Sequence, residues 1–287
     1  MIPSFDYKTP KTLGEACHLL WEFRDTAKII AGGTDLVIAL RSGDLRPQCL
    51  IDIARIEELR RIAEEEGRIT IGAGVTHSEI TSSPIIRRYG KVLSEAASWI
   101  GSPQIRNLGT LGGNIVNSSP AADTVPPLMT LNAVGRILSS EGEKEVPLDH
   151  LFKGPYETNL KPNEILAQVK FPKLPPAAKS SFIRLARREA MAIARMSVAV
   201  VLQMENSRIE EIRISGGSIT PTPQRMSQAE ALLKGNAPDE ERLRLAAHQV
   251  SEAMIRTSGI RPTTSYKKPV LEALFIRAVK KAVEDSI

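Results

Sequence analysis

The stretch that most constrains the fold of this chain is residues 101–127, GSPQIRNLGTLGGNIVNSSPAADTVPP. It contains a glycine pair, Gly112 and Gly113, and then a run of small residues that ends at Asp123. A backbone that approaches a ligand closely needs residues with little bulk, and glycine also permits left-handed turns. Successive amides in such turns form a concave nest, which holds phosphate oxygens with little help from Lys or Arg.

A second stretch of this kind lies upstream at residues 31–36, AGGTDL, directly after the apolar pair Ile29 and Ile30. Two Gly-Gly-polar loops about eighty residues apart suggest one extended ligand that carries a pyrophosphate. The alternative is that both stretches are tight turns with no ligand.

Length and composition exclude several classes of protein. With 287 residues, 42% of them hydrophobic, the chain is long enough to bury a sizeable core and to form about two domains. It has no apolar run long enough for a transmembrane helix, and the N-terminal residues carry no apolar signal segment, so we expect a cytoplasmic protein. The two cysteines, Cys17 and Cys49, cannot hold a four-cysteine iron–sulfur cluster, and a disulfide is not expected in a reducing compartment.

The positive charge is concentrated in the C-terminal part of the chain. Residues 1–170 hold 19 Lys and Arg against 21 Asp and Glu, whereas residues 171–287 hold 19 against 12. The aromatic content of 4% leaves little for stacking on bases, so we expect no nucleic-acid partner. A solvated face, or a docking face for an acidic partner subunit, explains these charges better.

The periodicity predicts an α+β chain. Residues 12–24 form an amphipathic helix, and short strands follow at 28–30 and 50–53. We expect a helical turn at 36–40, a hairpin from 59 to 74, a helix that starts at a capping box on Thr76, and a continuous helix from 85 to 100. A helix at 127–133 then leads into strands at 134–138, 145–146 and 165–171.

The clearest boundary is the proline-rich segment 172–176, PKLPP. Beyond it the sequence predicts longer strands at 180–186, 196–204 and 209–216, followed by helices, one of them started by a capping box on Ser227. The other helices are 242–255 and 270–283. We therefore expect an N-terminal domain, 1–173, with subdomains of about 1–55 and 56–173, and a C-terminal α+β domain, 174–287.

Several familiar kinds of site are absent from the sequence. The Gly72-Ala-Gly74 segment lacks the third glycine of a dinucleotide fingerprint, and the chain has neither a Walker loop nor a Gly-x-Ser-x-Gly elbow. The four histidines are isolated, so each is better explained as a cap or surface residue than as a catalyst or a metal ligand. We predict no catalytic residue and no metal site, which leaves a binder of a large cofactor that supplies its own chemistry.

Four motifs in order resemble one family. KIIAGGTDL (28–36), GRITIGAGVTHSEI (67–80), SPQIRNLGTLGGNIVNSSPAADTVPPLMTLNA (102–133) and ISGGSITPTPQRMSQAEALLKG (214–235) look like the FAD-binding medium subunit of the molybdenum hydroxylases. That group includes carbon monoxide dehydrogenase and the flavin domain of xanthine dehydrogenase. The resemblance implies a two-subdomain FAD-binding domain of the vanillyl-alcohol-oxidase (PCMH) type and then a C-terminal α+β domain.

The resemblance also implies the cofactor ligands. The first loop would wrap the pyrophosphate with Lys28, Ile29, Ala31, Gly32, Gly33, Thr34, Asp35 and Leu36. The second would lie on the flavin and ribityl side with Thr110, Gly113 and Asn114. The remaining positions would line the same cavity, and they are Gly101, Asp123, Leu166 and Arg184. Two alternatives stay open. Asp123 could instead cap the helix that begins near Val125, and Arg184 could belong to a solvated or subunit-facing cluster.

The implied activity is electron transfer through a bound flavin. An iron–sulfur small subunit and a molybdopterin large subunit would be the partners, in a dimer of heterotrimers, and electrons would pass from the 2Fe–2S clusters through FAD to NAD or another acceptor. A stand-alone flavoprotein reductase on the same fold and a scaffold subunit without cofactor are the alternatives. Neither the substrate nor the electron acceptor follows from the sequence.

Overall fold

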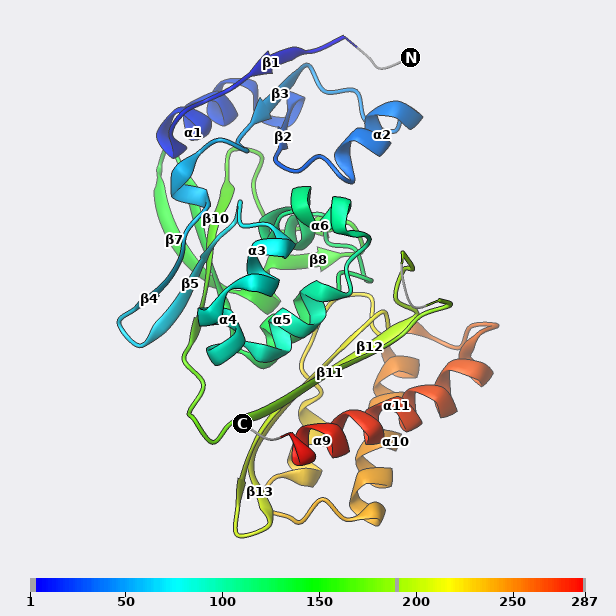
Figure 1. The fold of residues 1–287 in the computed structure, drawn as a ribbon. Helices are drawn as coiled ribbons and strands as arrows, with labels where there is room; N and C mark the ends of the chain where they lie inside the picture. The colour runs from blue at the N-terminus through cyan, green and yellow to red at the C-terminus, as the bar shows by residue number, and fades with distance from the viewer. Residues whose placement is uncertain (1–3, 189–190, 286–287) are drawn as a thin grey trace.

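The computed structural model describes residues 4–188 and 191–285. Its N-terminal part is a parallel sheet of three strands in the order β1-β3-β2. The strands and the segments around them are β1 (Asp6–Lys8), α1 (Leu13–Phe23), η1 (Arg24–Thr26), β2 (Ala27–Ile30), α2 (Leu36–Ser42) and β3 (Cys49–Asp52). In Figure 1 this part lies at the N-terminal, blue end of the molecule.

Helix α1 forms where the sequence predicted an amphipathic helix. The hydroxyl of Thr12 accepts a hydrogen bond from the amide of Glu15, which satisfies one of the free donors of the first turn. The apolar stripe that contains Leu13, Ala16 and Leu20 is buried. The expected turn at 36–40 is the longer helix α2, and Gly43 ends it with a φ of 84°.

The central part is an antiparallel sheet of five strands in the order β4-β5-β10-β6-β7. The strands are β4 (Ile62–Glu65), β5 (Arg68–Gly72), β10 (Ile165–Pro172), β6 (Val134–Ser139) and β7 (Gly142–Pro147). Six short helices follow β5: α3 (His77–Ser82), α4 (Pro84–Tyr89), α5 (Lys91–Ser98), α6 (Pro103–Leu108), α7 (Leu111–Val116) and α8 (Val125–Thr130). The remaining elements are η2 (Glu57–Leu59), η3 (Leu148–Leu151), β8 (Phe152–Gly154) and β9 (Glu157–Thr158).

The C-terminal part is an antiparallel sheet of three strands in chain order with helices packed on it. The elements are β11 (Lys179–Leu185), β12 (Met196–Glu205), β13 (Arg208–Gly217), α9 (Ser227–Leu233), α10 (Glu240–Ser258) and α11 (Thr264–Glu284). Figure 1 shows α9, α10 and α11 together on one side of these strands, away from the helices α3 to α6.

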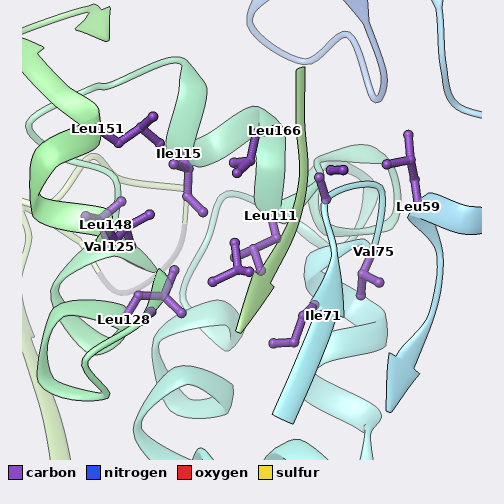
Figure 2. Packing of buried hydrophobic residues seen from close by; sticks show 14 of the residues in the cluster. Leu59, Ile71, Val75, Leu111, Ile115, Val125, Leu128, Leu148, Leu151 and Leu166 are labelled. Carbon is purple, nitrogen blue, oxygen red and sulfur yellow. The ribbon is translucent and has the colours of Figure 1, made fainter. Parts of the chain in front are cut away.

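Two hydrophobic cores meet at strand β12. One face of the strand, with Ala199 and Val201, belongs to the core of the first 170 or so residues, and the other face, with Val198 and Val200, belongs to the core under α10 and α11. The two-residue period of a strand allows this, because successive side chains point to opposite faces. Figure 2 shows part of the first core, where Leu111 and Ile115 of α7 pack near Leu166 of β10.

Most of the predicted elements are confirmed, and two predictions are wrong. The helix expected over 85–100 is broken at Gly90, where a Cβ would lie 3.1 Å from Cζ of Phe171, so that α4 and α5 are separate helices. The capping box on Ser227 does not form. Helix α9 has Met226 as its N-cap, and the carboxylate of Glu230 accepts hydrogen bonds from Arg225 and from the amide of Ile214 instead. The capping box of Thr76 and Glu79 is present.

Candidate functional site

A cavity of about 1880 Å³ lies among the three parts of the fold. It is larger than the roughly 300–1,000 Å³ of most small-ligand pockets, which leaves room for an extended ligand. Its wall includes all fifteen residues predicted as cofactor ligands, namely Lys28, Ile29, Ala31, Gly32, Gly33, Thr34, Asp35, Leu36, Gly101, Thr110, Gly113, Asn114, Asp123, Leu166 and Arg184. The fold therefore gathers positions that lie more than 150 residues apart in the chain, as Lys28 and Arg184 do.

The loop between β2 and α2, residues 31–36, lines this cavity. Gly33 has a φ of +68°, a conformation that residues with a Cβ rarely adopt. Gly32 packs against the turn after α6, because a Cβ on it would lie 1.8 Å from the carbonyl oxygen of Leu108. In the ranges 4–188 and 191–285, no acceptor takes a hydrogen bond from the amides of residues 31–36. The loop thus offers a row of free N–H groups to an anion.

The side chains of this loop tie it to the second glycine region. Thr34 donates a hydrogen bond of 3.3 Å to Asp35 Oδ2, and Asn117 Nδ2 donates one of 3.2 Å to Asp35 Oδ1. Together with the contact of Gly32 on Leu108, these bonds hold residues 31–36 beside the segment that contains α6 and α7. Both glycine regions line the same cavity.

The second glycine region is a helix start and not a loop. Thr110 is the N-cap of α7, and its hydroxyl accepts a hydrogen bond from the amide of Gly113. The amides of Leu111 and Gly112 donate to the carbonyls of Val75 and Ala73. The expectation that the amides of 110–114 form an anion nest is therefore wrong for the first turn of α7, whose donors are already used.

Gly112 is required by packing. A Cβ on it would lie 2.6 Å from the Cβ of Ala73 and 2.8 Å from the carbonyl oxygen of that residue, so α7 sits directly on the chain after β5. Gly113 is less crowded, since a Cβ there would meet only the hydroxyl of Thr110 at 2.9 Å. The glycine pair brings the helix close to the sheet and keeps its cavity-facing side free of bulk.

A buried ion pair closes the site toward the C-terminal strands. Arg184 Nη1 of β11 lies 2.9 Å from Asp123 Oδ2, and the two side chains are 3% and 6% exposed. Arg184 also donates to the carbonyls of Trp99 and Ala192, at 2.8 and 2.7 Å. The alternative that Asp123 caps the next helix is wrong, because α8 has Thr124 as its N-cap and no side-chain hydrogen bond there. Arg184 is likewise not part of a solvated cluster.

Burial raises the pKa of Asp123 to about 6, although the charge of Arg184 and its hydrogen bond favour the ionised carboxylate. Asp123 Oδ1 is buried and has no partner among the described residues. An unsatisfied carboxylate oxygen in the wall of a cavity costs free energy unless a ligand or water supplies a donor. Asp123 is therefore suited to accept a hydrogen bond from a bound molecule.

His77 also lines the cavity, and the sequence reasoning missed it. It is the first residue of α3 and only 2% exposed, and its amide donates to the carbonyl of Gly109, next to Thr110. Burial, with a smaller effect of Arg106, lowers its pKa to about 4, so the ring is neutral at pH 7. Its Nδ1 has no partner among the described residues. The sequence feature that could have indicated this burial is the position of His77 between Thr76 and Glu79 of the capping box.

The apolar wall of the cavity comes from several separate segments of the chain. Leu166 is buried in β10, where the pairing with β6 shifts register between Leu166 and Gln168. At the rim Tyr156 is 68% exposed and Ile193 is 80% exposed. Gly101 turns the chain at the same wall with a φ of +47°. A flat, largely apolar molecule could lie between such surfaces with its polar edge toward Asp123.

The described ranges give no sign of a metal site or of a membrane-spanning helix. They contain no group of three or more His, Cys, Asp or Glu side chains placed to hold a metal ion. Cys17 and Cys49 are buried, free thiols, and burial raises the pKa of both. Within these ranges we also find no helix with the length and hydropathy that a membrane span needs.

Known proteins resemble this chain in sequence and in architecture. Residues 3–174 match the FAD binding domain in molybdopterin dehydrogenase, and residues 181–282 match the C-terminal domain of the CO dehydrogenase flavoprotein. The chain belongs to this family. The resemblance predicted from the four motifs is thereby confirmed, as are the α+β fold class and the order of the FAD-binding and C-terminal domains.

Relatives of this FAD-binding subunit match it over nearly their whole length. The nicotinate dehydrogenase FAD-subunit of Eubacterium barkeri is 34% identical over 94% of this chain and 93% of its own. The carbon monoxide dehydrogenase medium chain of Hydrogenophaga pseudoflava is 32% identical over 98% of this chain and 97% of its own. The chain is accordingly an oxidoreductase subunit of the molybdenum hydroxylase type, and its cofactor is FAD.

Solved structures agree with this fold. A chain of carbon monoxide dehydrogenase from Hydrogenophaga pseudoflava superimposes with a TM-score of 0.93 at 32% identity and covers 99% of both chains. A chain of quinoline 2-oxidoreductase from Pseudomonas putida 86 gives a TM-score of 0.90 at 29% identity, with 99% of this chain and 98% of that chain covered. The residues of the cavity fit FAD: the free amides of 31–36 suit its diphosphate, and Asp123 Oδ1 lacks a partner that a bound molecule could supply.

Proposed function

We propose that this chain is the electron-transfer subunit of a heteromeric molybdenum hydroxylase. FAD would take electrons from 2Fe–2S clusters in a small subunit, which receives them from a molybdopterin large subunit, and pass them to NAD or another acceptor, in a dimer of heterotrimers. The observation that carries the proposal is the cavity, because one wall offers free backbone amides and another holds a buried carboxylate with an unused oxygen.

The residues of this chain have separate tasks in that proposal. The amides of residues 31–36 hold the diphosphate, and Gly33 gives the backbone the left-handed turn that points them at it. Gly101, Gly113 and Leu166 form an apolar surface with little bulk beside the ring system. The carboxylate of Asp123, held in place by Arg184, accepts a hydrogen bond from the cofactor.

Bound FAD supplies the redox chemistry, since it can accept and release electrons singly or in pairs. The chain itself needs no general acid or base for this. It excludes water from the apolar side and fixes the charge near the ring, and the buried carboxylate is ionised at pH 7 because its pKa of about 6 is below that value. Hydrogen bonds and local charge of this kind tune a cofactor's electronics.

Two features of the chain support the remaining assignments. On the basis of the two hydrophobic cores we propose an FAD-binding domain, 1–173, and a C-terminal domain, 174–287, and the matches to family domains over 3–174 and 181–282 support this division. The two cysteines are free and buried, which fits the reducing cytoplasm. Iron–sulfur clusters and molybdopterin are then left to partner subunits.

Purification of the tagged chain from its native host tests the proposal. We expect a yellow protein that retains FAD and co-purifies with two further chains, together with iron and molybdenum in the complex. A yellow protein that purifies alone and reduces a small substrate would favour the stand-alone reductase. A colourless complex with the same partners would favour the scaffold subunit. The variant Gly113→Ala, whose Cβ meets only Thr110, should lower FAD occupancy with the fold retained.

A further inference from the structure

Three basic side chains gather on the wall that the C-terminal part contributes to the cavity. Arg195 directly precedes β12, Arg261 lies between α10 and α11, and Lys267 is in the first turn of α11. All three line the same cavity as residues 31–36 and Asp123. Figure 1 shows α11 in the C-terminal part of the fold and β2 and α2 in the N-terminal part.

These three side chains have no acidic partner in the described ranges. Neighbouring cations are paired, Arg184 with Asp123 and Lys268 with Glu252. Within residues 4–188 and 191–285, however, no carboxylate forms an ion pair with Arg195, Arg261 or Lys267. Arg195 and Lys267 are half-buried and Arg261 is exposed. Repulsion among like charges raises the free energy of such a cluster, so a bound anion would stabilise it.

Neutral groups hold the cluster in place. Lys267 Nζ donates a hydrogen bond of 3.2 Å to the carbonyl of Ser218, and Arg261 Nε donates one of 3.0 Å to the carbonyl of Ser258. Burial lowers the pKa of Lys267, and the nearby charges of Arg261 and Arg195 lower it further. Both arginines therefore lie close enough to Lys267 to act on its charge, and all three side chains line the same cavity, where a bound anion could contact them.

The cluster is joined to the FAD-binding wall through one residue. The amide of Ser218, whose carbonyl accepts from Lys267, donates a hydrogen bond of 2.8 Å to the carbonyl of Pro120, three residues before Asp123. The amide of Arg195 donates to the carbonyl of Leu185, next to Arg184. These backbone bonds connect Lys267 and Arg195 to the chain segments that carry Asp123 and Arg184.

We propose that Arg195, Arg261 and Lys267 form a second anion site in this cavity, and that it binds the diphosphate of a nicotinamide dinucleotide that accepts electrons from FAD. This inference rests on the proposed function. A quinone could accept hydrogen bonds from these side chains but carries no negative charge to neutralise three cations, and an acidic protein acceptor would not reach the half-buried Lys267 in the cavity wall. The ring of Tyr266, with the Arg195 guanidinium 5.9 Å from its centre, offers a flat, half-exposed face beside the cations.

Titration calorimetry of the FAD-loaded complex with NAD+ tests the site. We expect saturable binding that weakens with added salt and that inorganic pyrophosphate competes away. Lys267→Gln and Arg261→Gln should each raise the Kd for NAD+ by about tenfold, the loss expected for one charge-assisted contact to phosphate. Glutamine can still donate to the carbonyl that each side chain now bonds, which protects the fold.

Lys280→Gln is the matched control. Lys280 is on the same helix but pairs with Glu240, so this variant removes the same charge and should bind NAD+ as the unmodified complex does. FAD content, read from the flavin absorbance, should be unchanged in all three variants.

Three results would overturn the inference. The first is FAD-loaded complex that binds no NAD+, and the second is equal affinity in the two cluster variants and in the unmodified complex. The third is loss of FAD from the cluster variants but not from Lys280→Gln, which would assign the cations to the cofactor's own diphosphate. A complex that carries no FAD at all would refute the proposed function itself, and it is recognised by its absorbance before any titration.

Discussion

Residues 31–36 and residues 110–114 face the same cavity, but their backbones are bonded differently. In the first region no described group accepts from the amides, and Gly33 turns the chain with a positive φ. In the second region the amides of Leu111, Gly112 and Gly113 are bonded to Val75, Ala73 and Thr110. Similar glycine pairs therefore serve different purposes, the first exposing donors to a ligand and the second packing a helix onto a sheet.

The difference shows that a Gly-Gly pair in a sequence does not by itself define a phosphate site. What decides is whether the amides that follow it find partners inside the protein. Between strand β2 and helix α2, the amides of residues 31–36 have no acceptor among the described residues. The amides of residues 111 and 112, by contrast, bond to the chain that leaves β5. Variants that affect one region and spare the other test this distinction.

The largest effect is expected from the ion pair at the edge of the second region. Arg184→Gln leaves Asp123 buried without its counter-charge, and removal of one partner of a buried pair typically costs about 3–5 kcal/mol. Urea unfolding of the FAD-free protein measures the loss. Addition of Asp123→Asn should recover much of it, because the uncompensated charge is then gone. Equal stability of the single and double variants would contradict this role of the pair.

Low pH should reduce the stability of the folded protein through protonation of His77, which lies beside the second region. Its folded pKa of about 4 is below the unfolded value near 6.5, so the native state binds fewer protons and loses stability as the pH falls through that window. At about 1.4 kcal/mol for each pKa unit, the loss is about 2–3 kcal/mol by pH 4.

Asp123 acts in the opposite direction. Its folded pKa of about 6 is above its usual value, so the native state gains stability as the pH falls from 6 toward 4. Comparison with His77→Gln isolates the histidine, since both proteins keep Asp123. Unfolding curves between pH 7 and pH 4 should show the smaller decline in His77→Gln. Parallel curves would mean that His77 does not titrate in this window.

Gly32→Ala should damage the first region by crowding. Its Cβ would lie 1.8 Å from the carbonyl oxygen of Leu108, so the loop must move away from the turn after α6. We expect a loss of about 1–3 kcal/mol in unfolding free energy and a large fall in FAD retention. Gly14→Ala is the control, because its Cβ has nothing nearer than 3.9 Å and alanine favours the helix. A Gly32→Ala protein that keeps FAD fully would contradict the packing.

The smallest expected effect is the difference in stability between the variants Thr110→Ala and Thr34→Ala. Thr110→Ala removes the N-cap of α7 and should cost about 1 kcal/mol. Thr34→Ala removes only a hydrogen bond to the neighbouring Asp35 and should stay within about 0.5 kcal/mol of the unmodified protein. Thermal unfolding of the FAD-free variants, side by side, measures both. The reverse order would mean that the first region, not the second, depends on side-chain bonds.

The sequence predicted the features that depend on local chemistry. The helix after Thr12, the capping box of Thr76 and Glu79, and the strands on both sides of the proline-rich segment follow from nearby residues, and they are present. The gathering of the site residues in one cavity came from the family resemblance, since spacing alone does not show which loops meet.

The features that the sequence did not predict depend on distant contacts. Gly90, where α4 and α5 separate, packs against the distant Phe171, and the Asp123–Arg184 pair joins positions 61 residues apart. The capping box on Ser227 fails because Arg225 and the amide of Ile214 take the carboxylate of Glu230. The partners of the first-turn amides of α7 also depend on a distant segment, because the carbonyls that accept from Leu111 and Gly112 lie 36 and 39 residues earlier.

Hydrogen exchange of the backbone amides, measured on the same protein with and without FAD, tests the central claim most directly. The account predicts that the amides of residues 31–36 exchange rapidly in the FAD-free protein and become strongly protected when FAD is bound, whereas those of residues 111–113 are protected in both states. Protection gained at 111–113 with no change at 31–36 would contradict it.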